Sequence, residues 1–301
     1  MMRKLLMLLA IAILIVSCGG KEETHVKSGD VLLDSAALKV AVMPTLDCLP
    51  LYVAETLGMF GREGVDVQLC RYQAQMDCDT AIANRRVEGM MTDLVRAERL
   101  KQQGMRLHYV TATQLSWQLL SSRTARIRQA KQLDDKMLAM TRYSATAMLA
   151  DEVVAGAGLQ NDRVFRIQVN DVSVRLSMLE NGIMDALFLP EPQATQARNL
   201  QAHVLMDTAA DGLWLGVLAF NRELTGSDAR QQQVEQLLKV YNQACDSINA
   251  YGLRHYGEII EQQCQVSKNT VDSLPSNYHF RHVMLPEVKA IDKAGDWLKK
   301  Q

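Results

Sequence analysis

A guanidinium and a predicted helix start stand together at residues 141–144, and both can bind anions. The segment is Thr141-Arg142-Tyr143-Ser144, and the predicted helix ends near residue 156. The first turn of a helix leaves backbone N–H groups without partners, so an anionic group can bind there. Arg142 could add a bidentate contact to a carboxylate, sulfonate or phosphate. The alternative is an arginine that is simply solvated at the surface, which is the more frequent case.

Glu191 offers the opposite chemistry. It stands between Pro190 and Pro192, so its backbone is rigidly placed. A buried carboxylate here would favour a ligand with an amino group or a ring N–H donor, and it would then bind the end opposite to Arg142. Alternatively, the carboxylate binds within the protein, at a hinge.

Further polar side chains follow predicted strands, where ligands of α/β proteins bind. The same residue types also cap helices, so each could be a ligand contact or a cap. The rings of Tyr143 and Trp214 could stack on a ligand ring or pack within the protein. The remaining candidate ligand contacts are Thr45, Asp47, Thr92, Asp93, Thr113, Asn170 and Asp171.

The sequence lacks the patterns of a catalytic or metal site. Its six histidines form no recognisable catalytic set, and it has no nucleophile elbow, phosphate loop or CxxC motif. We therefore expect no enzyme activity, no metal and no other cofactor. Besides Cys18 there are five cysteines, an odd number. Cys245 and Cys264 could be bridged in an oxidising compartment, or all five thiols could be free.

From residue 38 onward, short apolar runs alternate with longer periodic ones. This order is typical of β-α-β units around a largely parallel sheet. We predict an α/β protein with two lobes, a hinge and a cleft between the lobes. Lobe 1 comprises residues 37–115 plus 214–301, and lobe 2 comprises residues 116–213. Hinge closure around a small ligand is what such an arrangement can do.

The N-terminus has the features of an export signal. Arg3 and Lys4 precede the apolar residues 5–16, a run too short to span a bilayer. Residues 15–18, Ile-Val-Ser-Cys, resemble the lipobox of bacterial lipoproteins. We predict a signal peptide at 1–17, lipidation of Cys18 and a flexible tether at 18–36. The alternative is an ordinary signal peptide with a chance cysteine. Residues 21–23, Lys-Glu-Glu, resemble the signal that sends some Bacteroidetes lipoproteins to the outer surface; a solvated linker is equally possible.

The balance of charged residues limits the classes of partner that the protein can bind. The 33 basic and 34 acidic residues nearly balance, so no surface for a polyanion is indicated and nucleic acid is excluded as a partner. We expect a monomer that binds a small-molecule solute and is held on a membrane by lipid on Cys18.

Several motifs together resemble a known family. They are the strand 38–42 with the helix Leu-Pro-Leu-Tyr-Val-Ala at 49–54, Val-Glu-Gly-Met-Met-Thr-Asp at 87–93, Asp-Ala-Leu-Phe-Leu-Pro-Glu-Pro at 185–192, and Gly-Val-Leu-Ala-Phe at 216–220. They are similar to the periplasmic solute-binding proteins of ABC importers for nitrate, sulfonates and thiamine precursors. The resemblance implies a type II periplasmic-binding-protein fold and delivery of a solute to an ABC permease in the inner membrane.

The resemblance also defines the alternatives. Related pyrimidine synthases of thiamine biosynthesis share the opening strand and helix, but they carry a cysteine-dense motif that this chain lacks. A surface lipoprotein that kept the fold and lost transport is a third possibility. The transport hypothesis predicts a small anionic or heteroaromatic solute and a location in the cell envelope, on the periplasmic side or at the outer surface.

Overall fold

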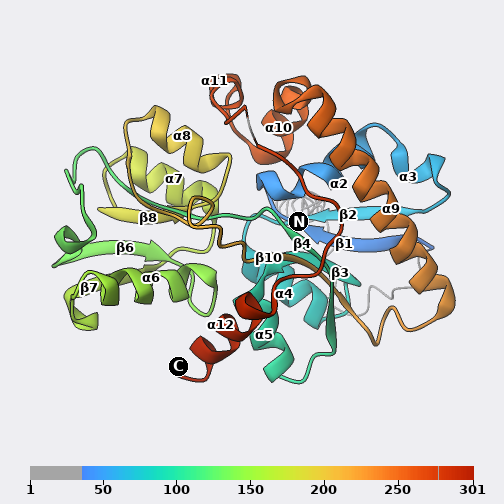
Figure 1. The fold of residues 1–301 in the computed structure, drawn as a ribbon, viewed down its shortest axis with the longest axis horizontal. Coiled ribbons are helices and arrows are strands. Elements are labelled where there is room, and N and C mark those ends of the chain that lie inside the picture. The colour runs from blue at the N-terminus through green and yellow to red at the C-terminus, as the bar shows by residue number, and fades with distance from the viewer. Residues whose placement is uncertain (1–35, 277) are drawn as a thin grey trace, which may run out of the picture. The chain divides into compact units, whose positions relative to one another are not determined.

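The computed structural model describes residues 36–276 and 278–301, which belong to the compact unit Leu32–Gln301. The predicted signal peptide, the lipidation of Cys18 and almost all of the tether lie outside the described residues. Within the described residues, strands and helices alternate along most of the chain and form two sheets with flanking helices (Figure 1). The predicted α/β fold with two lobes is confirmed.

The first sheet has the strand order β2-β1-β3-β10-β4. β1 pairs in parallel with β2 and β3, and β10 is antiparallel to both β3 and β4. The β1 sequence Leu-Lys-Val-Ala-Val is buried along its whole length, as expected for a strand covered on both faces. The strands are β1 (Leu38–Val42), β2 (Val67–Arg71), β3 (Gly89–Asp93), β4 (Leu107–Thr113) and β10 (Gly216–Asn221).

The second sheet repeats this pattern, with the order β7-β6-β8-β5-β9. β6 is parallel to β7 and β8, whereas β5 is antiparallel to β8 and β9. In each sheet the antiparallel strand follows a crossing from the other lobe, so each crossing is anchored inside a sheet. The strands are β5 (Gln118–Ser121), β6 (Lys136–Met140), β7 (Val164–Gln168), β8 (Ala186–Leu189) and β9 (His203–Asp207).

Three helices follow a strand either directly or after a short loop, and each carries a side-chain cap at its first turn. Asp93 caps α5 (Leu94–Gln102), Ser144 caps α6 (Ala145–Gly156) and Asp171 caps α7 (Val172–Glu180). The caps accept hydrogen bonds from backbone N–H groups that a helix start leaves free. These helix starts therefore lie at the carboxyl ends of the strands, where the candidate ligand contacts were predicted.

The other helices cover the sheets and join the lobes. α9 (Asp228–Tyr251) is the longest helix of the described residues and buries one face, including Leu237, Tyr241 and Ile248, against the first lobe. Full burial of one such side chain contributes about 1.5–3 kcal/mol. The remaining helices are α2 (Leu49–Thr56), α3 (Met59–Arg62), α4 (Gln75–Ala83), α8 (Gln193–Asn199), α10 (Gly257–Cys264), α11 (Lys268–Asp272) and α12 (Val288–Leu298).

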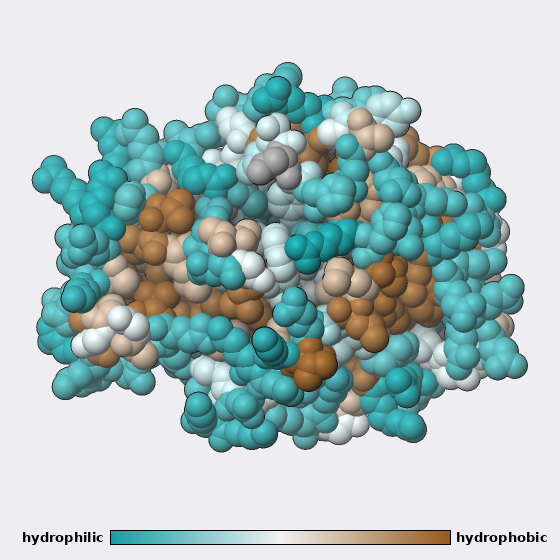
Figure 2. All heavy atoms as spheres, in the orientation of Figure 1, coloured by the Kyte–Doolittle hydropathy of each residue, from teal (hydrophilic) through white to brown (hydrophobic). Residues whose placement is uncertain are grey.

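The protein surface carries both hydrophilic and apolar residues. On the face in Figure 2, hydrophilic residues dominate and separate apolar patches lie on both lobes, as is usual for a folded protein. In the described part of the chain, no helix has the length and apolar character to cross a bilayer. The five described cysteines are all free, so Cys245 and Cys264 are not bridged.

Gly216 permits a close approach at one crossing between the lobes. It pairs with Asp93 of β3 on one side and with Thr113 of β4 on the other. A Cβ atom at residue 216 would lie 2.1 Å from Thr113 Oγ1 and 2.4 Å from Leu115 Cβ. We expect Gly216→Ala to destabilise the fold by about 1–3 kcal/mol, because the segment 113–115 would have to move.

Thermal unfolding of the full chain measures this effect. Gly156→Ala, in α6, is the matched control because a Cβ atom there meets nothing within 4 Å. Alanine at a helical position should leave stability unchanged or raise it by up to about 1 kcal/mol. Equal melting temperatures for Gly216→Ala and the wild type would contradict the packing argument.

Candidate functional site

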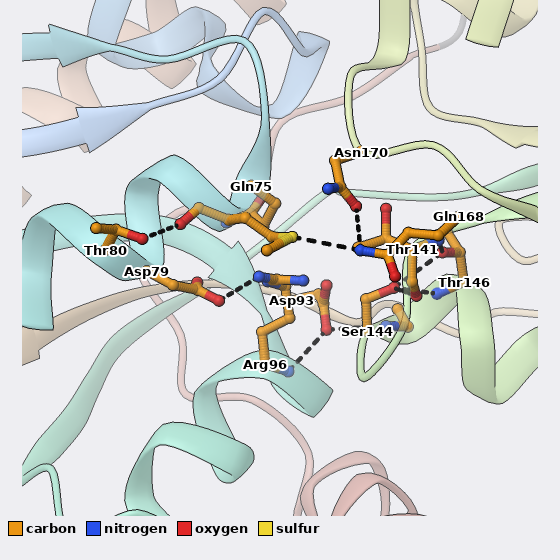
Figure 3. A network of polar contacts seen from close by, with 12 residues as sticks. Gln75, Asp79, Thr80, Asp93, Arg96, Thr141, Ser144, Thr146, Gln168 and Asn170 are labelled. Carbon is orange, nitrogen blue, oxygen red and sulfur yellow. Dashed lines mark hydrogen bonds and ion pairs between the residues drawn. The ribbon is translucent and has the colours of Figure 1, made fainter.

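A cavity lies between the two lobes at the carboxyl ends of their strands. Its unfilled space is about 470 Å³, including the part that opens to solvent. Lobe 1, the crossing 114–117 and lobe 2 all contribute side chains, and Figure 3 shows several polar ones that face each other across the cleft. The lining residues are Met43, Thr45, Asp47, Gln75, Met91, Thr92, Asp93, Leu115, Trp117, Thr141, Ser144, Thr146, Asn170, Val172 and Arg175.

Arg175 is the cation of this cavity. It lies on α7, and only 1% of its surface is exposed. Its Nε donates to the carbonyl of Val169 at 2.6 Å and its Nη1 to the carbonyl of Phe188 at 3.0 Å, while Nη2 donates to the hydroxyl of Thr141. All of these acceptors are neutral. Among the described residues no carboxylate forms an ion pair with this guanidinium.

Burial, and to a lesser extent the nearby charge of Arg96, lower the pKa of Arg175 to about 9, against a smaller opposite effect of Asp171. The group remains protonated at neutral pH. A buried cation without an anionic partner is costly, since desolvation disfavours its charged form. An anion in the cavity would supply the missing partner.

Other donors at the cavity also lack partners. The indole Nε1 of Trp117 and the hydroxyl of Thr92 are buried and make no hydrogen bond within the described part of the chain. The indole N–H can only donate. Buried polar groups are nearly always paired, so such orphans call for a partner. Together with Arg175, they favour a ligand rich in acceptor oxygens.

Asp93 joins the two lobes. Its Oδ1 accepts a hydrogen bond from the backbone N–H of Arg96 in lobe 1 and another from Ala145 in lobe 2, each at 3.0 Å. One carboxylate oxygen thus caps α5 and also contacts the first residue of α6. Burial raises the pKa of Asp93 to about 6, and Arg96 opposes this rise.

Asp47 holds the lobe 1 wall of the cavity. It accepts hydrogen bonds from the hydroxyls of Thr45 at 2.6 Å and of Thr113 at 2.9 Å. Burial raises the pKa of Asp47, and the two threonine hydroxyls oppose the rise. Because Thr113 ends β4, this contact ties the first strand loop to the start of the crossing into lobe 2.

The twelve residues predicted from the sequence as ligand contacts divide into three groups. Half of them line the cavity: Thr45, Asp47, Thr92, Asp93, Ser144 and Asn170. Thr113 stands behind Asp47, and Asp171 caps α7 and bridges to Ala74 of lobe 1. Asp171 and Thr113 therefore support the cavity without lining it.

The other four candidates lie elsewhere. Arg142 and Tyr143 are exposed and border a separate hollow near Trp297, and the ring of Tyr143 also contacts Arg99. Glu191 pairs with Arg198 at 2.9 Å and caps its own helix start through Thr195, while its carbonyl accepts from the N–H of Leu46. The carboxylate therefore binds within the protein, at the start of α8 in lobe 2, and it is the backbone carbonyl of Glu191 that contacts lobe 1. Trp214 borders a different hollow, near Arg281.

The sequence did not single out several lining residues, above all Arg175 and Trp117. The available signal for Arg175 was a lone cation after a strand-end loop, in a helix whose only other charged residue is Glu180 at its end. Trp117 lies on the crossing 114–117, whose position under the cleft no local pattern reveals. Gln75 and Thr146 complete the set of polar lining residues that were not predicted.

The described residues hold no cluster of three or more histidine, cysteine or carboxylate side chains that could bind a metal ion. Cys48, whose thiol contacts the hydroxyl of Thr45, is fully buried, and burial raises its pKa well above the usual value. The site is equipped for binding through hydrogen bonds and charge.

Comparison with solved structures identifies the fold. The alkanesulfonate-binding protein SsuA of Xanthomonas axonopodis pv. citri, bound to MOPS, aligns with a TM-score of 0.74 and 16% identity over 89% of this chain and 93% of that one. The periplasmic nitrate-binding protein NrtA of Synechocystis PCC 6803 aligns with a TM-score of 0.68 and 11% identity over 83% and 74%. At these identities the likeness establishes the fold, which is the predicted periplasmic-binding-protein fold.

A ligand-binding component of an ABC-type import system from Staphylococcus aureus has the same fold, with a TM-score of 0.74 and 14% identity over 88% of this chain and 92% of that one. No curated protein sequence matches this chain at a significant level. The family model described as NMT1/THI5 like matches residues 45–250 of the 301. The chain therefore belongs to the NMT1/THI5-like family.

Proposed function

We propose that this protein captures a small solute with an oxyanion group in its cleft and delivers it to an ABC permease. The observation that carries the proposal is Arg175, a buried guanidinium that lines the cavity without an anionic partner. The structural neighbours named above for alkanesulfonate and nitrate support the same class of solute. A binding role without catalysis agrees with the donor chemistry of the cavity.

The cavity is two-sided. Arg175, Trp117 Nε1 and Thr92 Oγ1 supply donors, whereas Met43, Met91, Leu115 and Val172 supply apolar surface. Small-molecule sites typically combine a few placed polar groups with apolar walls. We therefore propose an oxyanion head bound at Arg175 and a short apolar or flat tail against the methionines and Trp117. A heteroaromatic solute, such as a thiamine-precursor pyrimidine, is the alternative, since Trp117 could stack on its ring.

We further propose that the chain is exported and held on a membrane by lipid on Cys18. The N-terminal pattern of a basic start, an apolar run and Ile-Val-Ser-Cys supports this. The tether would keep a monomeric two-lobed receptor close to its permease on the periplasmic side, with lobe boundaries near residues 115 and 213. Exposure on the outer surface, and an interaction role without transport, remain the alternatives.

Capture would depend on a closed form in which α12 bridges the lobes. α12 packs on α5 of lobe 1, and it also contacts α6 of lobe 2 (Figure 1). The indole Nε1 of Trp297 donates to Asp151 Oδ2 at 2.8 Å, and Lys293 pairs with Glu152 at 3.0 Å. These contacts would stabilise closure together with the Asp93–Ala145 contact at the cavity.

The first prediction concerns Arg175. In Arg175→Gln the cation is lost, and we expect binding of the preferred probe to weaken about 10- to 100-fold, because a charge-assisted hydrogen bond contributes about 1.5–3 kcal/mol. Isothermal titration of the full chain with methanesulfonate, nitrate and an aminopyrimidine measures this, with circular dichroism as the check on folding.

Arg142→Gln is the matched control, since that arginine is exposed and outside the cavity lining. It should bind the probes as the wild type does. Equal losses in both variants would contradict the assignment of Arg175. A wild-type chain that binds no probe, and retains no solute on purification, would count against the capture of a small anion.

The second prediction concerns the bridge made by α12. Trp297→Phe keeps an aromatic ring but removes the N–H that donates to Asp151. One hydrogen bond contributes about 0.5–1.5 kcal/mol, so the open form should gain about two- to tenfold in population. Small-angle scattering of the solute-free chain should report a larger radius of gyration. Trp214→Phe is the control, and a scattering curve of Trp297→Phe identical to that of the wild type would refute the bridge.

A further inference from the structure

Asp93 has one carboxylate oxygen in use and one available. Oδ1 accepts the N–H groups of Arg96 and Ala145. Within the described part of the chain, Oδ2 has no hydrogen bond or ion pair, although only 2% of the residue is exposed and it lines the cavity. Figure 3 shows Asp93 between the Arg96 side chain and the Thr141 and Ser144 side chains of lobe 2.

Several charged or titratable groups surround Asp93, and the nearest cation is already paired. Arg96 lies on the same helix turn and is buried, but it already forms an ion pair with Asp79 of α4. The helix α6 presents a backbone N–H to Asp93 and no charge. The titratable or charged groups that face Asp93 or share its cavity are Arg96, Asp79, Tyr109 of β4, Asp47 and Arg175.

An oxyanion bound at Arg175 would enter this cavity beside Asp93. Two negative groups close together in a buried site disfavour each other's ionised form. Arg96 cannot offset this fully, because Asp79 already shares its charge. The oxyanion cannot titrate if it is a sulfonate or nitrate, so the carboxylate is the group that must respond.

We propose that Asp93 takes up one proton from solvent when the oxyanion binds, and that its protonated Oδ2 then donates a hydrogen bond to the oxyanion. Oδ1 keeps both backbone N–H groups, so the contact between the lobes is retained. The proton returns to solvent when the solute leaves. This inference rests on the proposed capture of an anion, and it makes Asp93 a specificity-determining residue that favours acceptor oxygens over donor groups.

The sign of the pH dependence follows from linkage. The bound state holds the proton on Asp93 more tightly than the free state, in which the pKa is already raised to about 6 by burial. Affinity is therefore greatest below pH 6 and is lost as pH rises through the pKa of the bound state. Near neutral pH, where binding takes up one proton, affinity falls about tenfold for each unit by which pH rises.

The test uses the full chain and methanesulfonate or nitrate, which remain anionic throughout the range studied. Titration calorimetry at pH 5.5, 6.5 and 7.5 should be carried out in bis-Tris, imidazole and Tris chloride, because sulfonate buffers would compete. The observed enthalpy should depend on the ionisation enthalpy of the buffer with a slope that corresponds to about one proton taken up near pH 7.

Asp93→Asn separates titration from structure. Its side-chain carbonyl can accept the same two N–H groups, and its amide donates permanently, as protonated Asp93 would. We expect this variant to bind the probe with an affinity independent of pH, and more tightly than the wild type at pH 7.5. Asp228→Asn, at an exposed helix start remote from the cavity, should keep the wild-type pH dependence.

Each outcome decides the inference. Wild-type binding with no pH dependence and no proton uptake overturns it while leaving anion capture intact. Weaker binding of Asp93→Asn at every pH also overturns it, since a purely structural role of the carboxylate would then suffice. If neither probe binds at any pH, the proposed capture of an anion fails, and the inference fails with it.

Discussion

One carboxylate, that of Asp93, makes hydrogen bonds to both lobes, and the proposed closure of the cleft depends on this contact. Closure removes polar groups from water, and each of them must find a partner in the other lobe or in a ligand. Asp93 meets this requirement for two backbone N–H groups, those of Arg96 and Ala145, with a single oxygen. The helix start that could have bound an anion from solution is therefore already contacted by an anion of the protein itself.

In the proposed function, recognition of a solute therefore falls to side chains deeper in lobe 2. Arg175 is left with neutral acceptors, and Trp117 and Thr92 are left with hydrogen-bonding groups that the described residues do not satisfy. A receptor gains from such a deficit, because the ligand that completes the hydrogen bonding also stabilises the closed form. Without a bound anion, the positive charge of Arg175 is unfavourable, because burial removes it from water.

The repeated topology of the two sheets fixes the two crossings that run between the lobes beside the cavity. Each crossing ends in a strand held inside the opposite sheet, so the crossings 114–117 and 208–215 are fixed at one end by ladder hydrogen bonds. Gly216 lets that backbone approach Thr113, and Thr113 in turn holds Asp47. The position of Asp47 in the lobe 1 wall of the cavity therefore depends on how closely the backbone at Gly216 packs against Thr113.

The sequence by itself determined the order of strands and helices, the two-lobed α/β class and the strand ends at which polar residues gather, because alternation and capping are local properties. It also located Asp93 and Thr92 at the cavity. It pointed to Arg142, at a helix start, and did not single out Arg175, yet Arg142 is exposed and Arg175 lines the cavity. Nor could it place Trp117 at the cavity or pair the Glu191 carboxylate with Arg198 and Thr195. Only the tertiary structure decided these, because the direction of a side chain between two lobes depends on how residues distant in the sequence pack together.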